Sequence, residues 1–201
     1  MTEETTQFLV PQDQYLKAGI HIGTKFRTKY MEKFIYKTRP DGLSVLNLQQ
    51  IDERIGIAGR FLAQFEPDEI LIVSRRENGW KAVKAFQQAT GARIYAGRYP
   101  PGTLTNPVLK NFSEVKIILV TDSWPDRNAI EDANRVGIPV LALCDSNNQA
   151  NKIDLVIPCN NKGKKSLGLF FYILAREFMR NSGKIGKEDD ISVPLDDFME
   201  E

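Results

Sequence analysis

The residues of this chain best suited to chemistry are cations and aromatic rings that alternate within one short segment. The segment spans residues 18–36, AGIHIGTKFRTKYMEKFIY, with two glycines ahead of its charged part. Its cations are Lys25, Arg27, Lys29 and Lys33, and its rings are Phe26, Tyr30, Phe34 and Tyr36. Phosphates attract Lys and Arg, and unstacked bases stack on rings, so the pattern favours binding of RNA. The alternative is a solvated basic hairpin whose rings fill the core.

The charge of the chain is unevenly distributed, although the formal net charge is only +1. Residues 17–39 hold seven Lys or Arg and one acid, and residues 162–187 have the same balance, so each segment carries +6. Residues 188–201 hold seven acids and no base. Because the position of charge decides where a polyanion binds, we predict two basic RNA-binding segments and a separate acidic tail. The dense acid of the tail predicts disorder in the free protein, or docking on a basic partner.

Residues that could carry out catalysis or bind a metal are few. Asp122 and Asp126 follow an apolar run and could hold Mg²⁺ or transfer protons, but such aspartates more often cap helices and bond loop amides. His21 is the only histidine, and we expect a structural imidazole. Cys144 and Cys159 follow strand-like runs and are expected to be buried free thiols. The sequence has no G-x-G-x-x-G fingerprint, P-loop or G-x-S-x-G elbow. We therefore predict no catalytic residues, metal, cofactor or small-molecule substrate.

Apolar runs and helical spacings alternate along most of the chain. Short β-branched runs predict strands at 69–73, 92–96, 115–120, 139–144 and 153–157. Helical spacing is found at 51–65, 79–90, 126–136 and 164–179, and the last segment has one wide apolar stripe. Asp126 is the predicted N-cap of the third helix. The alternation predicts an α/β fold with a doubly wound, mostly parallel sheet flanked by helices.

The ends of the chain complete the predicted organisation. Residues 34–47 predict a basic N-terminal hairpin that turns at residues 40–42. We expect a single domain at 1–187, followed by the acidic tail at 188–201. No apolar run approaches the roughly 18 residues that span a bilayer, so no membrane partner is expected. The acidic N-terminus lacks the pattern of a secretory signal, which favours the cytoplasm.

Four segments, in order, closely resemble family two of the small-subunit ribosomal proteins: residues 18–47, 97–107, 129–148 and 153–169. The resemblance runs from about Val10 to Arg180. It points to the archaeal and eukaryotic branch, because IPCNNKG at 157–163 stands where bacterial members usually have an acidic stretch. Only PVLKNFSE at 107–114 occupies the place where bacterial members insert a helical hairpin. Eukaryotic relatives include the laminin-receptor precursor, which has a long C-terminal extension. This chain stops at Glu201, so we expect the archaeal type.

The resemblance implies a Rossmann-like, flavodoxin-type domain without a nucleotide cofactor. It also implies a non-catalytic, structural role in translation, on small-subunit ribosomal RNA and beside neighbouring ribosomal proteins. The composition of the acidic tail leads to a separate hypothesis, that the tail docks on a basic neighbour, with a solvated tail as the alternative. A small-molecule enzyme or a protein-binding module on the same sheet are the alternatives. The RNA-binding candidates are Lys25, Arg27, Lys29, Lys33, Arg76, Arg98, Thr103, Thr105, Asn106, Asn160, Asn161, Lys162, Lys164 and Lys165.

The chain departs from the family pattern at two strand ends. Archaeal members commonly have Arg-Gln-Tyr-Gly after the first core strand, whereas Glu77 and Asn78 follow Arg76 here. They commonly have Asp-Pro-Arg after the next diagnostic strand, whereas Ser123 and Trp124 are found here. The tryptophan in place of a cation leaves two roles open: stacking on a base, or packing against a neighbouring protein.

Overall fold

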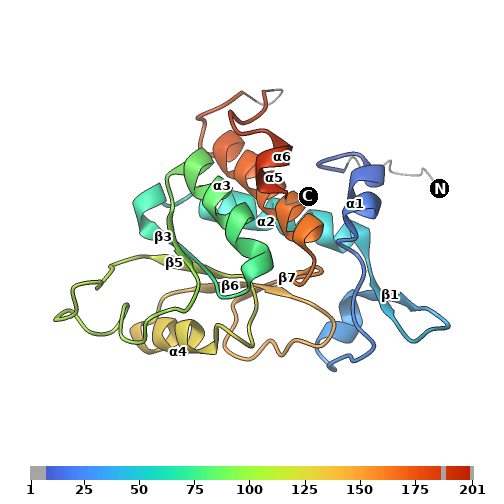
Figure 1. Cartoon of the computed structure of the whole chain (residues 1–201), viewed down its shortest axis with the longest axis horizontal. Helices are drawn as coiled ribbons and strands as arrows, with labels where there is room; N and C mark the ends of the chain where they lie inside the picture. Colours follow the sequence, from blue (N-terminus) through green and yellow to red (C-terminus); the bar gives the residue numbers. More distant parts are fainter. Residues whose placement is uncertain (1–7, 187–188, 200–201) are drawn as a thin grey trace.

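The computed structural model describes residues 8–186 and 189–199 as one α/β unit (Figure 1). A short helix, α1 (Gln12–Ala18), precedes a two-stranded antiparallel hairpin of β1 (Ile35–Thr38) and β2 (Ser44–Leu46). The strands that follow are β3 (Ile70–Ser74), β4 (Arg93–Ala96), β5 (Ile117–Val120), β6 (Val140–Cys144) and β7 (Leu155–Pro158). The further helices are α2 (Leu48–Leu62), α3 (Trp80–Thr90), α4 (Arg127–Val136), α5 (Lys164–Asn181) and α6 (Leu195–Phe198).

The five later strands form one parallel sheet in the order β4-β3-β5-β6-β7. If these five strands are renumbered 1 to 5 in chain order, the order in the sheet is 2-1-3-4-5, as in flavodoxin-type folds. The predicted fold class is therefore confirmed. β3, β5 and β6 are buried at every position. Strands covered on both faces need continuous apolar runs, which is why these runs could be recognised in the sequence.

The helices are divided unequally between the two faces of the sheet. α2, α3 and α5 cover one face, and α4 covers the other (Figure 1). The connection from β4 to β5 has no helix, and residues 97–116 form a loop instead. The predicted hairpin at 34–47 is confirmed, and Gly42 in its turn has the left-handed backbone that glycine adopts without strain. Within the described parts of the chain, no helix has the length and apolar character needed to cross a membrane.

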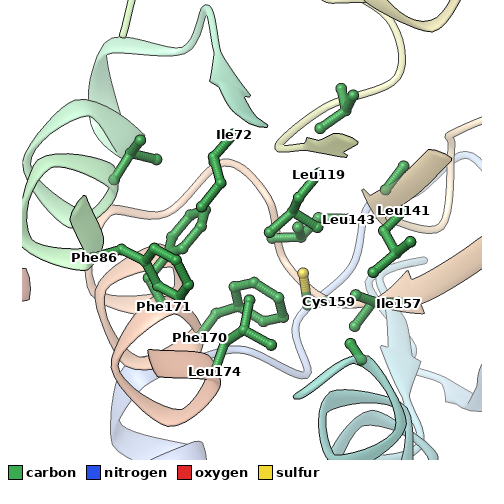
Figure 2. Packing of buried hydrophobic residues seen from close by; sticks show 14 of the residues in the cluster. Ile72, Phe86, Leu119, Leu141, Leu143, Ile157, Cys159, Phe170, Phe171 and Leu174 are labelled. Carbon is green, nitrogen blue, oxygen red and sulfur yellow. The ribbon is translucent and has the colours of Figure 1, made fainter. Parts of the chain in front are cut away.

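The core is built around α5. Figure 2 shows Phe170, Phe171 and Leu174 of this helix packed toward the apolar side chains of the strands, with Phe86 of α3 beside them. Burying each such side chain contributes about 1.5–3 kcal/mol. The burial extends beyond the predicted stripe, since every residue from Ser166 to Arg176 is buried. A helix of a surface layer normally leaves one face exposed, so something must cover the outer face of α5.

The described part of the acidic tail covers α5. α6 packs against α3 and α5, and both Ile191 and Phe198 are buried. The Tyr172 hydroxyl donates to Asp190 Oδ2 at 2.5 Å. A Cβ at Gly168 would lie 2.7 Å from the carbonyl oxygen of Phe198, so the tail approaches α5 closely because position 168 is glycine. The prediction that the free tail is disordered is therefore wrong for residues 189–199. The predicted boundary between residues 187 and 188 lies outside the described residues.

Candidate nucleic-acid interface

The carboxyl edge of the parallel sheet gathers most of the sequence-predicted side chains. In doubly wound sheets, ligands bind beyond this edge. β3 leads into Arg75 and Arg76, β4 into Arg98, β5 into Asp122, and β7 into Asn160. Because all five strands are parallel, these residues line one edge of the molecule.

The middle of this edge is filled by the chain's own polar groups. Buried Asp122 accepts hydrogen bonds from Arg76 Nε at 2.5 Å and from Asn148 Nδ2 at 2.8 Å. Asn161 donates to Asn148 Oδ1 at 3.1 Å and to the Leu143 carbonyl at 3.3 Å. Buried polar groups of this kind are normally satisfied, and here they bond one another except for Asn161 Oδ1, which is buried without a partner. Asp122 therefore braces strand-end loops. Asn161 is fully buried, whereas Arg76 is held by Asp122 with its side chain partly exposed.

The first basic segment is anchored on the loop after β6. The Thr24 N–H donates to Ser146 Oγ at 2.9 Å, and Ser146 Oγ donates to the Phe26 carbonyl at 2.9 Å. The Thr28 N–H donates to the Ser146 carbonyl at 2.9 Å, and its hydroxyl donates to the Asn148 carbonyl at 2.8 Å. These bonds hold the backbone, while Lys25, Arg27 and Lys29 remain exposed in the intervening positions. The anchor Ser146 was not predicted, because its only signal in the sequence is its position two residues after a strand.

A glycine makes this docking possible. A Cβ at Gly23 would lie 2.9 Å from the Ser44 carbonyl oxygen and 3.1 Å from Ser146 Oγ. The Gly23 N–H donates to that same Ser44 carbonyl at 2.8 Å, so the hairpin and the basic segment meet at this point.

The aromatic rings of the segment are divided between core and surface. Phe34 is buried, whereas Phe26, Tyr30 and Tyr36 are 78%, 45% and 70% exposed. The Lys33 ammonium lies 3.8 Å from the centre of the Tyr30 ring, a cation–π distance. Both readings of the pattern therefore hold in part: one ring fills the core, and three remain accessible for stacking.

The start of the second basic segment lies beside the first. The Asn160 N–H donates to the Ile20 carbonyl at 2.8 Å, and its side chain donates to the Gly19 carbonyl at 3.2 Å. Lys162 Nζ lies 3.0 Å from Asp145 Oδ2, and Lys164 and Lys165 are exposed in the first turn of α5. Arg176 belongs to the same sequence segment but is buried and donates to the Leu9 carbonyl. Only the beginning of the second segment therefore joins the first at this edge.

The remaining candidates lie in the loop that connects β4 to β5. Arg98 follows the carboxyl end of β4, whereas the loop around Thr103 runs back toward the amino end of this strand: the Ser113 N–H donates to the Thr103 carbonyl, and Arg93 at the start of β4 donates to Ser113 Oγ. Arg98, Thr105 and Asn106 are exposed there. Thr103 is fully buried, and its hydroxyl donates to the Pro100 carbonyl at 2.7 Å, so this side chain stabilises the loop. Four strand spacings separate β4 from β7, about 19 Å. The exposed candidates thus form two groups, of which Arg98 is the member of the second group that lies at the carboxyl edge.

Asp126 differs from its predicted role. It precedes α4, but its side chain makes no capping hydrogen bond. Asp126 Oδ2 accepts from the Arg75 N–H at 3.2 Å, and Oδ1 is buried without a partner. Burial raises the pKa of this carboxyl to about 7, and the nearby Asp122 charge adds to the effect.

This raised pKa predicts that Asp126 opposes folding at neutral and alkaline pH. An ordinary aspartate has a pKa of about 3.9, so the folded state holds the proton more tightly than the unfolded state. The resulting stabilisation is complete below about pH 4 and is lost as the pH rises through about 7. Asp126→Asn is neutral at every pH, so its stability relative to wild type should rise by about 1–3 kcal/mol between pH 4 and pH 8. Urea unfolding at both pH values measures this; a pH-independent difference contradicts it.

The other titratable candidates show no sign of catalytic use. Cys144 and Cys159 are buried free thiols, as predicted, and burial raises the pKa of both. Partial burial lowers the pKa of His21, which lies beside the Tyr15 carbonyl. Among the residues that the structure describes, no group of three or more His, Cys, Asp and Glu side chains is placed to hold a metal ion.

The fold and this edge together define a class of protein: a flavodoxin-type domain whose strand-end crevice is partly filled by its own polar side chains and is flanked by exposed cations. The family described as "Ribosomal protein S2" matches residues 15–116 and 109–180. Small ribosomal subunit protein uS2 of Nanoarchaeum equitans (strain Kin4-M) is 50% identical over 190 residues, which cover 94% of each chain. The protein of the same name from Picrophilus torridus is 45% identical over 198 residues, 98% of each chain. The chain belongs to the ribosomal protein S2 family.

Proposed function

We propose that the chain is a structural, non-catalytic constituent of the small ribosomal subunit, which binds ribosomal RNA along the carboxyl edge of its sheet. The observation that carries the proposal is that the two basic segments meet at one end of the carboxyl edge. Asn160 bonds Gly19 and Ile20, and Thr24 and Lys162 both contact the loop after β6 at residues 145–146. Family membership supports the same role, since the relatives are named as small ribosomal subunit proteins. Neighbouring ribosomal proteins are the expected protein partners, and the ribosome of the cytoplasm is the expected location.

The proposed RNA contacts are the candidates that the structure leaves on the surface. They are Lys25, Arg27, Lys29, Lys33, Arg98, Thr105, Asn106, Lys164 and Lys165. Exposed Lys and Arg suit phosphates, while Thr and Asn suit ribose or phosphate oxygens, so these contacts position the protein without reading base sequence. Lys162 is half-buried and held by Asp145, which fits a role in shaping the loop.

Two measurements test this function. Tagged protein should sediment with small subunits in a cell lysate, and the purified protein should bind small-subunit ribosomal RNA with strong salt dependence. If about five phosphates are contacted, the slope of log affinity against log salt should lie between about −4 and −5. A slope near zero, or tagged protein that stays at the top of the gradient, would contradict the proposal.

A further inference from the structure

A single exposed tryptophan stands where flavodoxin-type sheets bind their ligands. β3 connects onward to β4 on one side, whereas β5 connects to β6 on the other, so the sheet changes direction between β3 and β5. Ligands of such folds bind at this switch point. Here Arg75, Arg76, Trp124 and Pro125 line an open hollow of about 450 Å³.

The tryptophan is held in place but its ring is uncovered. The Trp124 N–H donates to Asp122 Oδ1 at 3.1 Å, and Asp122 is itself held by Arg76 and Asn148. The side chain is nevertheless 69% exposed, and within the described residues neither a ring nor a cation is stacked on it. A large flat ring on a fixed backbone is a preformed stacking surface.

The charges around the ring favour an anion. Arg75 is exposed, and its Nη1 donates to the Pro125 carbonyl at 3.4 Å, which keeps the guanidinium beside the tryptophan loop. Arg98 follows Gly97, whose N–H donates to the Ser74 carbonyl at 2.8 Å, so a further exposed cation belongs to the adjacent loop. The acids nearby are Asp122 and Asp126, both buried, and Glu77, which is exposed.

We propose that Trp124 and Arg75 bind one unstacked nucleotide of an RNA strand, with the base stacked on the indole and the phosphate on the guanidinium. The inference rests on the proposed function and deepens it, since it adds recognition of a single-stranded base to contacts with phosphates. The hollow lies between the ends of β3 and β5, on the same edge as Arg98 and the exposed lysines of residues 24–29, and so continues the proposed interface.

A protein partner fits this surface less well than a nucleotide. Protein interfaces are also enriched in Trp and Arg, but their cores are built from several apolar side chains in contact. The hollow beside Trp124 is lined by two arginines and a proline. The other large hydrophobic residues exposed on the described parts of the chain lie at residues 16–36, 108–109 and 136. Trp124 is therefore a lone exposed ring with arginines beside it, a combination that suits single-stranded nucleic acid.

The affinity of the full chain for small-subunit ribosomal RNA tests the proposal. Loss of one base–aromatic stack weakens binding by roughly 5- to 150-fold, so Trp124→Ala should show a loss in this range with an unchanged salt slope. Trp124→Phe should recover most of the affinity, because a ring is restored. Arg75→Ala should instead reduce the steepness of the slope by about 1. Val136→Ala removes an exposed apolar side chain from the far end of α4 and should bind as wild type does.

Fluorescence supplies a readout independent of affinity. The chain has two tryptophans, and Trp80 is half-buried with its indole N–H bonded to the Ser74 carbonyl. In a Trp80→Phe background the emission reports Trp124 alone. A single-stranded oligoadenylate should quench it, whereas inorganic phosphate and fully paired RNA should not.

The outcomes separate this inference from the function on which it rests. If wild-type protein binds ribosomal RNA but Trp124→Ala binds equally well, the stacking proposal is wrong and the proposed function stands. If Trp124→Ala binds RNA normally but is lost from assembled subunits, the ring packs on a protein and the proposal is also wrong. If the wild type binds no ribosomal RNA, the proposed function itself fails.

Discussion

Replacing Arg27, Lys29 and Lys33 together by alanine is expected to weaken binding to small-subunit ribosomal RNA about 100-fold at 0.15 M salt. Each phosphate contact contributes about 0.9 to the slope of log affinity against log salt, so loss of three contacts makes the slope shallower by about 2.7. If the two proteins bind equally at about 1 M salt, this difference in slope amounts to about two orders of magnitude in affinity at 0.15 M. The three side chains are exposed, and their contacts are surface ones, such as the 3.6 Å pair of Arg27 with Glu32. Surface substitutions usually change stability by less than about 0.5 kcal/mol each, so the melting temperature should hardly move.

A matched control separates the position of charge from its amount. Arg60, Lys84 and Arg135 are equally exposed but lie on α2, α3 and α4 rather than in the basic segment. Replacing these three by alanine lowers the net charge by the same amount and should leave most of the affinity intact. Filter binding over a salt series and incorporation into small subunits measure both variants. Normal incorporation of the folded Arg27, Lys29 and Lys33 variant would show that the segment is only a solvated hairpin.

The RNA-binding candidates were only partly predictable, because the sequence shows which side chains are polar but not whether they face the surface or the interior. Asn161 and Thr103 are polar residues within recognisable blocks, yet both side chains are buried and bonded inside the protein. Nothing local distinguishes an asparagine that braces a loop from one that contacts a ribose. The exposed lysines of residues 24–33 were predictable, because a long charged side chain leaves the core wherever the backbone permits.

The proximity of the two basic segments could not be predicted from charge alone. More than a hundred residues separate Gly19 from Asn160, whose side chain donates to the Gly19 carbonyl. Thr24 and Lys162 also contact the same loop after β6, because β6 and β7 end at the same edge. The strands themselves were predictable, since continuous apolar runs are required in a buried parallel sheet. Their order in the sheet decides which loops become neighbours, and that order depends on packing across the whole domain.

The tail was misjudged because its partner is part of the same chain. Ile191 and Phe198 are apolar residues within the acidic tail, but the surface that receives them depends on Gly168 and on how α3 and α5 pack together. A sequence that mixes acids and apolar residues is compatible with disorder, with docking on a partner protein and with docking on its own domain. Only the three-dimensional surface decides among these states.

Truncation after Lys187 is therefore expected to destabilise the domain as well as change its charge. Loss of the buried Ile191 and Phe198 side chains, offset by the entropy of the released segment, should cost about 2–4 kcal/mol. For a domain of this size that lowers the melting temperature by roughly 5–15 °C. The tail carries seven acids and no base, so its removal also raises the formal net charge from +1 to +8. Non-specific affinity for RNA should rise accordingly.

Two further variants separate packing from charge in this experiment. Gly168→Ala should displace the tail without changing its charge, because the added Cβ would meet the Phe198 backbone at 2.7 Å. It should lower the melting temperature as truncation does. Asp196→Asn with Asp197→Asn removes two exposed charges and keeps the packed residues, so it should raise RNA affinity with little change in melting temperature.

Because the tail docks on its own helices, truncated protein that is folded should stay in high-salt-washed subunits as firmly as the full chain. A truncated protein that melts like wild type but leaves those subunits would show instead that the tail binds a neighbour.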